Sequence, residues 1–160
     1  MRMSWCLLAA LFFSVALESA VAQESAPPRA KLIRLGFDTP EAWFVREHLA
    51  ELERDTPFDG MAVHLPRLRV NGKPGVTYGH LVFGKKRFLA SDFDAWLEDA
   101  KAIRSGKLTD NFIYVSVTGA DYDFFADEAW ETVRHNFALV AGLVRRAGFK
   151  GVFFDVEHYN

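Results

Sequence analysis

The chain has 160 residues, 50% of them apolar, and a formal net charge of −2 at pH 7. This near balance of charge argues against a surface made for nucleic acid or for an anionic membrane, because both need a marked excess of Lys and Arg. Cys6 is the only cysteine. It lies in the N-terminal apolar segment, so we expect the mature chain to contain neither a thiol nor a disulfide and to depend on an apolar core.

The N-terminus has the pattern of an export signal. Arg2 supplies a positive charge, residues 5–17 are apolar, and residues 20–22 (Ala-Val-Ala) form a small-x-small cleavage site. The apolar run is shorter than the roughly 18 residues that a membrane-spanning helix needs, and Glu18 interrupts it. The sequence therefore predicts a signal peptide over 1–22 and a secreted or periplasmic protein that keeps no membrane attachment after cleavage.

A short linker is predicted over residues 23–30, which contain a Pro-Pro pair and no periodicity. The domain is expected over 31–160. Within it, β-rich runs alternate with stretches of helical periodicity, a pattern that favours parallel strands joined by crossover helices. Strands are predicted at residues 32–37, 61–65, 112–117 and 152–156, and apolar helix faces at residues 43–52, 93–103 and 130–144.

Several residues mark the ends of these elements. Thr39 is predicted to cap the first helix with Pro40 at its first position, Ser91 opens a capping-box pattern for the second, and Gly148 suits the end of the third. Turn signals at Asn71-Gly72 and Pro74-Gly75 predict a β-hairpin within an insertion over residues 67–88. An insertion after the second strand projects over the face where the parallel strands end.

Four strands and three helices are about half of a closed (β/α)₈ barrel, which takes about 250 residues. We therefore predict an α/β fold that is the N-terminal half of a TIM barrel, and thus a fragment of such a barrel. The alternative is a small doubly wound sheet with the same alternation. Residues 36–40 after the first strand contain no Gly-rich phosphate loop, which favours the barrel.

The strongest candidate for chemistry is the pair Asp155 and Glu157 at the end of the last predicted strand. Side chains two residues apart share one face of a strand, so both carboxylates are expected on the same side, beyond Phe153. Two crowded carboxyl groups at a buried strand end favour a general acid. The alternatives are that both are solvated residues of a loop or that Asp155 caps a turn. Their place at the carboxyl end of a barrel strand favours catalysis.

Residues 149–159 resemble the end of strand four in chitinase-like hydrolases, where a glycine-led apolar strand finishes in Asp-x-Glu and an aromatic residue. The resemblance implies that Glu157 is the acid and that Asp155 orients the acetamido group of the substrate. The family's first two Asp positions hold Gly151 and Phe153 here. Many other retaining glycosidase barrels also have their acid/base Glu at this strand end, usually after Asn, where this chain has Val156.

The whole mature chain is similar to the N-terminal part of secreted bacterial barrel proteins described as hydrolase-like. This wider resemblance implies the fold more firmly than the reaction.

Side chains at other strand ends are candidates for substrate binding. They are Asp38, His64, Tyr78, Asp121, Tyr122 and Tyr159. Aligning the Phe-x-Gly units before the second and fourth strands predicts that His64 lies level with Asp155. His64 is alternatively a satisfied core residue, and Asp38 a helix cap. The tyrosines offer surfaces for sugar rings, whereas Trp43, on a helix, is expected in the core.

The sequence thus predicts a secreted hydrolase of O-glycosidic bonds in poly- or oligosaccharides, with Glu157 as proton donor and Asp155 as its neighbour. No cofactor, metal or nucleic acid is expected to take part, and the second catalytic carboxylate is not assigned. One alternative is a metal-dependent hydrolase that uses Asp155, Glu157, His158 and His64 as ligands, although no His-Glu-x-x-His motif is present. The other is a carbohydrate-binding barrel without activity.

Overall fold

The computed structural model describes residues 29–36, 38–117, 123 and 125–156. All elements below belong to the compact unit Lys31–Asn160. The predicted signal peptide lies outside the described residues. So do four of the predicted site residues, Asp121, Tyr122, Glu157 and Tyr159.

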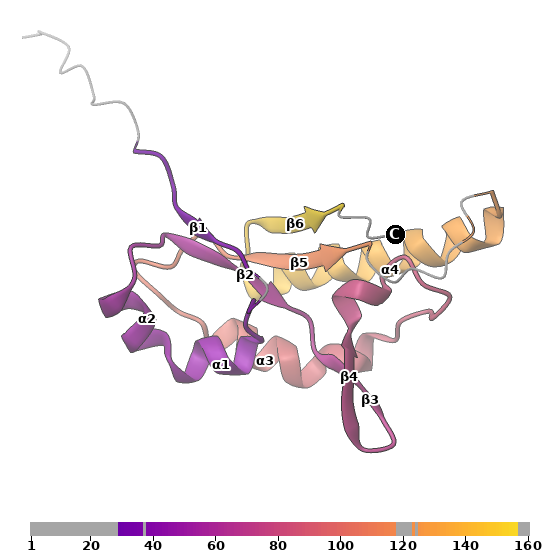
Figure 1. Ribbon diagram of the computed structural model, residues 1–160, viewed down its shortest axis with the longest axis horizontal. Coiled ribbons are helices and arrows are strands. Elements are labelled where there is room, and N and C mark those ends of the chain that lie inside the picture. Colours follow the sequence, from indigo (N-terminus) through magenta and orange to yellow (C-terminus); the bar gives the residue numbers. More distant parts are fainter. Residues whose placement is uncertain (1–28, 37, 118–122, 124, 157–160) are drawn as a thin grey trace, which may run out of the picture. The chain divides into compact units, whose positions relative to one another are not determined.

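A curled, all-parallel sheet forms the centre of this unit (Figure 1). Its strands follow the order β1-β2-β5-β6, and each neighbouring pair is parallel. The strands are β1 (Ile33–Arg34), β2 (Gly60–His64), β5 (Phe112–Ser116) and β6 (Gly151–Asp155). The predicted α/β class with four parallel strands is therefore confirmed.

The helices pack against one face of this sheet (Figure 1). The α-helices are α1 (Ala42–Glu47), α2 (Leu49–Asp55), α3 (Asp94–Ala102) and α4 (Asp127–Ala147), and the 3₁₀ turns are η1 (Tyr78–Leu81) and η2 (Ala90–Phe93). The first predicted helix is in fact two, because the backbone leaves helical geometry at His48, with φ −105° and ψ 15°. None of the helices in the described part of the chain is long and apolar enough to cross a membrane.

Two predicted helix starts are wrong. Thr39 does not cap α1, because the backbone after it joins the sheet: the Pro40 carbonyl oxygen accepts a hydrogen bond of 2.8 Å from the backbone N–H of His64. Glu41 forms a parallel bridge with His64 and remains extended, so the helix begins only at Ala42. Ser91 lies inside η2, where Asp92 accepts from the backbone of Leu89, and α3 follows after that turn.

The end of α4 follows the prediction, but its apolar face is different. Gly148 takes a left-handed conformation with φ 74° and donates to carbonyl oxygens in the last helical turn. Trp130, expected in the core, is 39% exposed, whereas Asn136 is fully buried. Asn136 accepts from the backbone N–H of Phe88 at 3.0 Å and donates to the carbonyl oxygens of Val82 and Lys86. A buried amide that satisfies a neighbouring loop thus replaces a purely apolar helix face.

The predicted hairpin region contains an antiparallel pair, β3 (Arg67–Val70) and β4 (Lys73–Thr77). Asn71 and Gly72 form its turn with positive φ values of 51° and 76°. Pro74-Gly75 is not a second turn, because both residues lie within β4 and Pro74 pairs with Arg69. After β4, η1 packs so closely on the sheet that a Cβ at Gly79 would lie 2.5 Å from the Tyr114 carbonyl oxygen.

Alternate residues of each central strand form the core on the helix side of the sheet. Met61, Val63 and Leu65 of the β2 segment, together with Ile113 and Val115 of β5, are fully buried there. The intervening residues of β5 and β6 point to the opposite face, which we call the inner face. The inner face carries most of the polar side chains that are discussed next.

Candidate functional site

Tyr114, Phe153 and Asp155 share the inner face of the sheet. Tyr114 pairs with Phe153 across β5 and β6, and their rings stack with centroids 6.4 Å apart and planes 9° from parallel. Phe154 points the other way, where its ring contacts Phe83 and Phe137. This alternation brings Asp155, two residues beyond Phe153, to the inner face at the carboxyl end of β6.

The Tyr114 hydroxyl donates a hydrogen bond to Oδ2 of Asp155. Asp155 pairs in register with Ser116, so the long tyrosine side chain extends along the sheet to reach the carboxylate. A hydrogen bond to an ionised carboxylate is among the stronger ones in proteins. The carboxyl group predicted to support catalysis is thus held by a side chain from the neighbouring strand.

Two histidines extend this cluster. The ring centroid of His64 lies 4.9 Å from that of Tyr114 and 5.7 Å from that of His80, and the His80 and Tyr114 centroids are 6.0 Å apart. His64 ends β2, whereas His80 comes from η1, which the chain reaches only after the hairpin. Four side chains from separate segments, His64, His80, Tyr114 and Asp155, form what we call the inner-face cluster.

Burial keeps the imidazoles of this cluster neutral near pH 7. His64 is 8% exposed, and burial, reinforced by His80 and Arg67, lowers its pKa to about 4. Burial and Arg67 also lower the pKa of His80, against a smaller raising effect of Asp155. Nδ1 of His64 is buried without a hydrogen-bond partner among the described residues. A neutral imidazole can donate or accept, which suits it to a ligand hydroxyl.

The register of the strands corrects one prediction about His64. It pairs with Tyr114, which pairs in turn with Phe153, so His64 lies level with Phe153 rather than with Asp155. The aligned Phe-x-Gly units fail because Gly60 and Gly151 are not at the same level: Ala62 and Gly151 both pair with Phe112. Such a stagger between successive strands accompanies the closure of a curled sheet.

Two other predicted site residues do not belong to the inner-face cluster. Tyr78 is 6% exposed and packs between the rings of Phe88 and Phe93, so it belongs to the core and is not a surface for sugar stacking. Its burial raises the pKa of the phenol. Asp38 follows β1 with a side chain that is 79% exposed, and it pairs with Arg34 at 2.5 Å. It does not cap a helix.

Sequence reasoning missed Tyr114 and His80. In the sequence, Tyr114 is one residue of an apolar predicted strand. Its contact with Asp155 of β6 depends on how the two strands pair, which the sequence does not show. His80 lies in an insertion without periodicity, and only its position after the hairpin gives a signal. Among the residues that the structure describes, no group of three His, Cys, Asp or Glu side chains is arranged to hold a metal ion.

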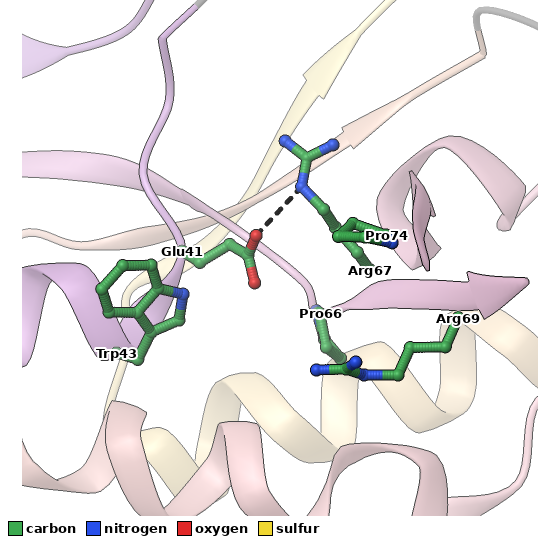
Figure 2. A pocket seen from close by; sticks show the side chains of 6 residues that line it. All are labelled: Glu41, Trp43, Pro66, Arg67, Arg69 and Pro74. Atoms are coloured by element: carbon green, nitrogen blue, oxygen red, sulfur yellow. Dashed lines mark hydrogen bonds and ion pairs between the residues drawn. The ribbon is translucent and has the colours of Figure 1, made fainter. Parts of the chain in front are cut away.

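A hollow of about 480 Å³ lies beyond the carboxyl end of β2, beside the hairpin (Figure 2). Its lining residues are Glu41, Trp43, Pro66, Arg67, Arg69 and Pro74. Trp43, expected in the core, is 45% exposed. The core-facing side of α1 and α2 carries Ala42, Val45, Leu49 and Leu52, which recur at helical spacing, and Trp43 lies on the opposite side of α1.

No family model, curated protein or solved structure matches the chain. The chemistry of the site must therefore be argued from its own side chains. The inner-face cluster offers a positioned carboxylate, a phenol and two neutral imidazoles. Together these groups can orient hydroxyl-rich ligands and support proton transfer.

Proposed function

We propose that the chain is the N-terminal half of a TIM-barrel hydrolase of O-glycosidic bonds and that the inner-face cluster belongs to its active site. The observation that carries the proposal is the hydrogen bond from Tyr114 to Asp155, on the face of the sheet opposite the α-helices and at the carboxyl ends of parallel strands. In barrels of this kind, active sites are built at that end of the strands.

Glycoside hydrolysis needs a carboxyl proton donor and a second carboxylate that acts as nucleophile or base. Glu157, two residues after Asp155 in sequence, is proposed as the donor. Asp155, fixed by Tyr114, is proposed to orient the substrate or the donor. The second carboxylate is proposed on a later strand of the barrel. This chemistry needs no metal or cofactor.

The histidines support the proposal through their protonation state. With the pKa of His64 at about 4, its ring is uncharged near neutral pH, as is that of His80. Neutral rings can exchange hydrogen bonds with sugar hydroxyls without forming an ion pair with Asp155. The cluster is therefore suited to an uncharged, hydroxyl-rich substrate portion next to the carboxylates.

The test is a pair of substitutions in the natural gene product. Glu157→Gln should lower kcat about a hundredfold or more, because the amide cannot donate the proton. Asp155→Asn should lower activity through lost orientation. Glu131→Gln, a change of an exposed carboxylate on α4, is the matched control and should leave turnover unchanged. Full hydrolysis by Glu157→Gln would contradict the proposal.

Two further outcomes would replace this proposal with the alternatives. Activity that EDTA abolishes and Zn²⁺ restores would indicate a metal-dependent hydrolase. Glycan binding without turnover by the wild-type protein would indicate a carbohydrate-binding barrel.

A further inference from the structure

The hollow of Figure 2 and the inner-face cluster are built partly from neighbouring segments of the chain. Pro66 and Arg67 follow β2 after one intervening residue, and Glu41 forms a backbone bridge with His64. Arg67 is also close enough to lower the pKa values of both histidines. A substrate that extends from the cluster toward the hairpin would therefore enter this hollow.

Trp43 gives the hollow an apolar wall. Its indole is 45% exposed and is held by an edge contact with Phe44, with ring centroids 5.8 Å apart and planes at 83°. Figure 2 shows the indole on one side of the hollow and the side chains of Arg67 and Arg69 on the other. An exposed aromatic ring opposite charged side chains offers a small ligand both an apolar surface and polar groups that can orient it.

Of the two arginines that line the hollow, Arg69 is the one available to bind a charged ligand. Arg67 is engaged by Glu41, with Nε 3.0 Å from Oε1. Among the described residues, Arg69 has no ion pair with a carboxylate, and its guanidinium makes one long hydrogen bond of 3.5 Å to the Gly72 carbonyl oxygen. A guanidinium has five N–H donors, so most of those of Arg69 are available. Two arginines against one carboxylate leave the lining with a net positive charge.

We propose that this hollow is a subsite for a sugar that carries an anionic group, either a carboxylate or a sulfate. The apolar face of the sugar ring packs on Trp43, and the anionic group accepts hydrogen bonds from Arg69. Glu41 keeps Arg67 in place and accepts from a sugar hydroxyl. The inference rests on the proposed function, because it makes the anionic sugar one unit of the glycan that reaches the inner-face cluster.

The experiment measures binding and turnover separately in the natural gene product. Binding is measured by calorimetry on the Glu157→Gln protein with an oligogalacturonate, a sulfated chondroitin oligosaccharide and a neutral cello-oligosaccharide. Turnover of the same compounds is measured on the wild-type protein. The two anionic probes distinguish a carboxylate from a sulfate as the recognised group.

We expect at least one anionic probe to bind more tightly than the neutral one, and its affinity to fall as salt is raised. Arg69→Gln should weaken this binding about tenfold and leave neutral binding unchanged, because a charge-assisted hydrogen bond is lost. Trp43→Ala should weaken both. Arg145→Gln removes an exposed arginine of α4 outside the hollow and should change neither.

Equal affinities for anionic and neutral probes, or an Arg69→Gln protein with unchanged affinity, would overturn the inference. Hydrolysis of the neutral glycan by a protein that binds no anionic probe more tightly than the neutral one would overturn the inference while leaving the proposed function intact. Arg69-dependent binding of an anionic probe without turnover of any probe would support the subsite and contradict the hydrolase. Thermal unfolding confirms that the surface variants are folded.

Discussion

Tyr114 and Asp155 come from neighbouring parallel strands and are joined by a hydrogen bond from the phenol to the carboxylate. The bond runs along the inner face of the sheet, beside His64 and His80. It helps to fix the direction of the carboxylate at the end of β6. The substitution that removes only this bond is therefore the most direct probe of the cluster.

Tyr114→Phe keeps the ring stacked on Phe153 and deletes the hydroxyl. If Asp155 orients groups in the active site, kcat of the natural gene product should fall about tenfold or more, since a hydrogen bond to a charged group contributes about 1.5–3 kcal/mol. Tyr78→Phe is the matched control, because it removes a phenol hydroxyl from the core. Equal activities of the two variants would show that the bond to Asp155 is structural only.

The stability of the protein should depend on pH through His64. Its pKa is about 4 in the folded state against an ordinary value of 6.5, so the unfolded chain binds the proton first as the pH falls. Stability should be complete above pH 6.5 and decline between 6.5 and about 4. Denaturant unfolding at pH 7.5, 6 and 5 measures this decline.

His64→Gln serves as the comparison in the same measurements. The variant cannot take up a proton, so its stability should change less between pH 7.5 and 5. His80, whose pKa is also lowered, accounts for a residual slope in the same direction. An unaltered slope in His64→Gln would show that His64 is not the group that titrates.

Asn136→Ala should destabilise the fold by about 3 kcal/mol, because it leaves the Phe88 N–H and two carbonyl oxygens without their partner in the core. Glu131→Ala, an exposed change on the same helix, should stay within about 0.5 kcal/mol of wild type. Chemical unfolding gives both values. A loss below 1 kcal/mol in Asn136→Ala would mean that water or a rearranged loop replaces the amide.

The half-barrel proposal predicts how residues 23–160 behave when expressed alone. Apolar side chains are exposed at both edges of the described sheet, with Leu32 46% and Leu35 43% exposed beside β1, and Phe154 44% and Val156 65% exposed at β6. Unpaired strand edges are templates for association. Size-exclusion chromatography should show larger species that increase with concentration. A monomer with one sharp unfolding transition would contradict the proposal.

The strands were predictable from sequence because their evidence is local. Residues 61–65 and 152–156 were expected as strands, and β2 and β6 each begin and end one residue earlier. The end of α4 at Gly148 was predictable for the same reason, because the left-handed backbone at a helix end favours glycine. Properties that depend on how the strands pair could not be predicted from the sequence. The level of His64 relative to Asp155 is one example, because it follows from the stagger of the sheet.

Which residues form the inner-face cluster could not be predicted fully from the sequence, for the same reason. Nothing in the sequence around His80 indicates that the insertion returns to the sheet and contacts Tyr114. Trp43 was misplaced for another reason: the core-facing side of α1 carries Ala42 and Val45, and a short apolar pattern does not distinguish that side from the one that carries Trp43. Asp155 could be selected from the sequence because it is a carboxylate at the end of a predicted strand, so one short segment shows both its position and its chemistry. Glu157, the other half of that prediction, lies outside the described residues.

Gly79 has a consequence for recognising distant relatives of this chain. A Cβ at this position would lie 2.5 Å from the Tyr114 carbonyl oxygen, closer than any side chain tolerates without moving the backbone. Any relative that keeps His80 against the same strand must therefore have glycine just before that histidine. A Gly-His pair after a hairpin, followed by a strand with tyrosine at its third position, is a signature that searches can use where overall similarity has been lost.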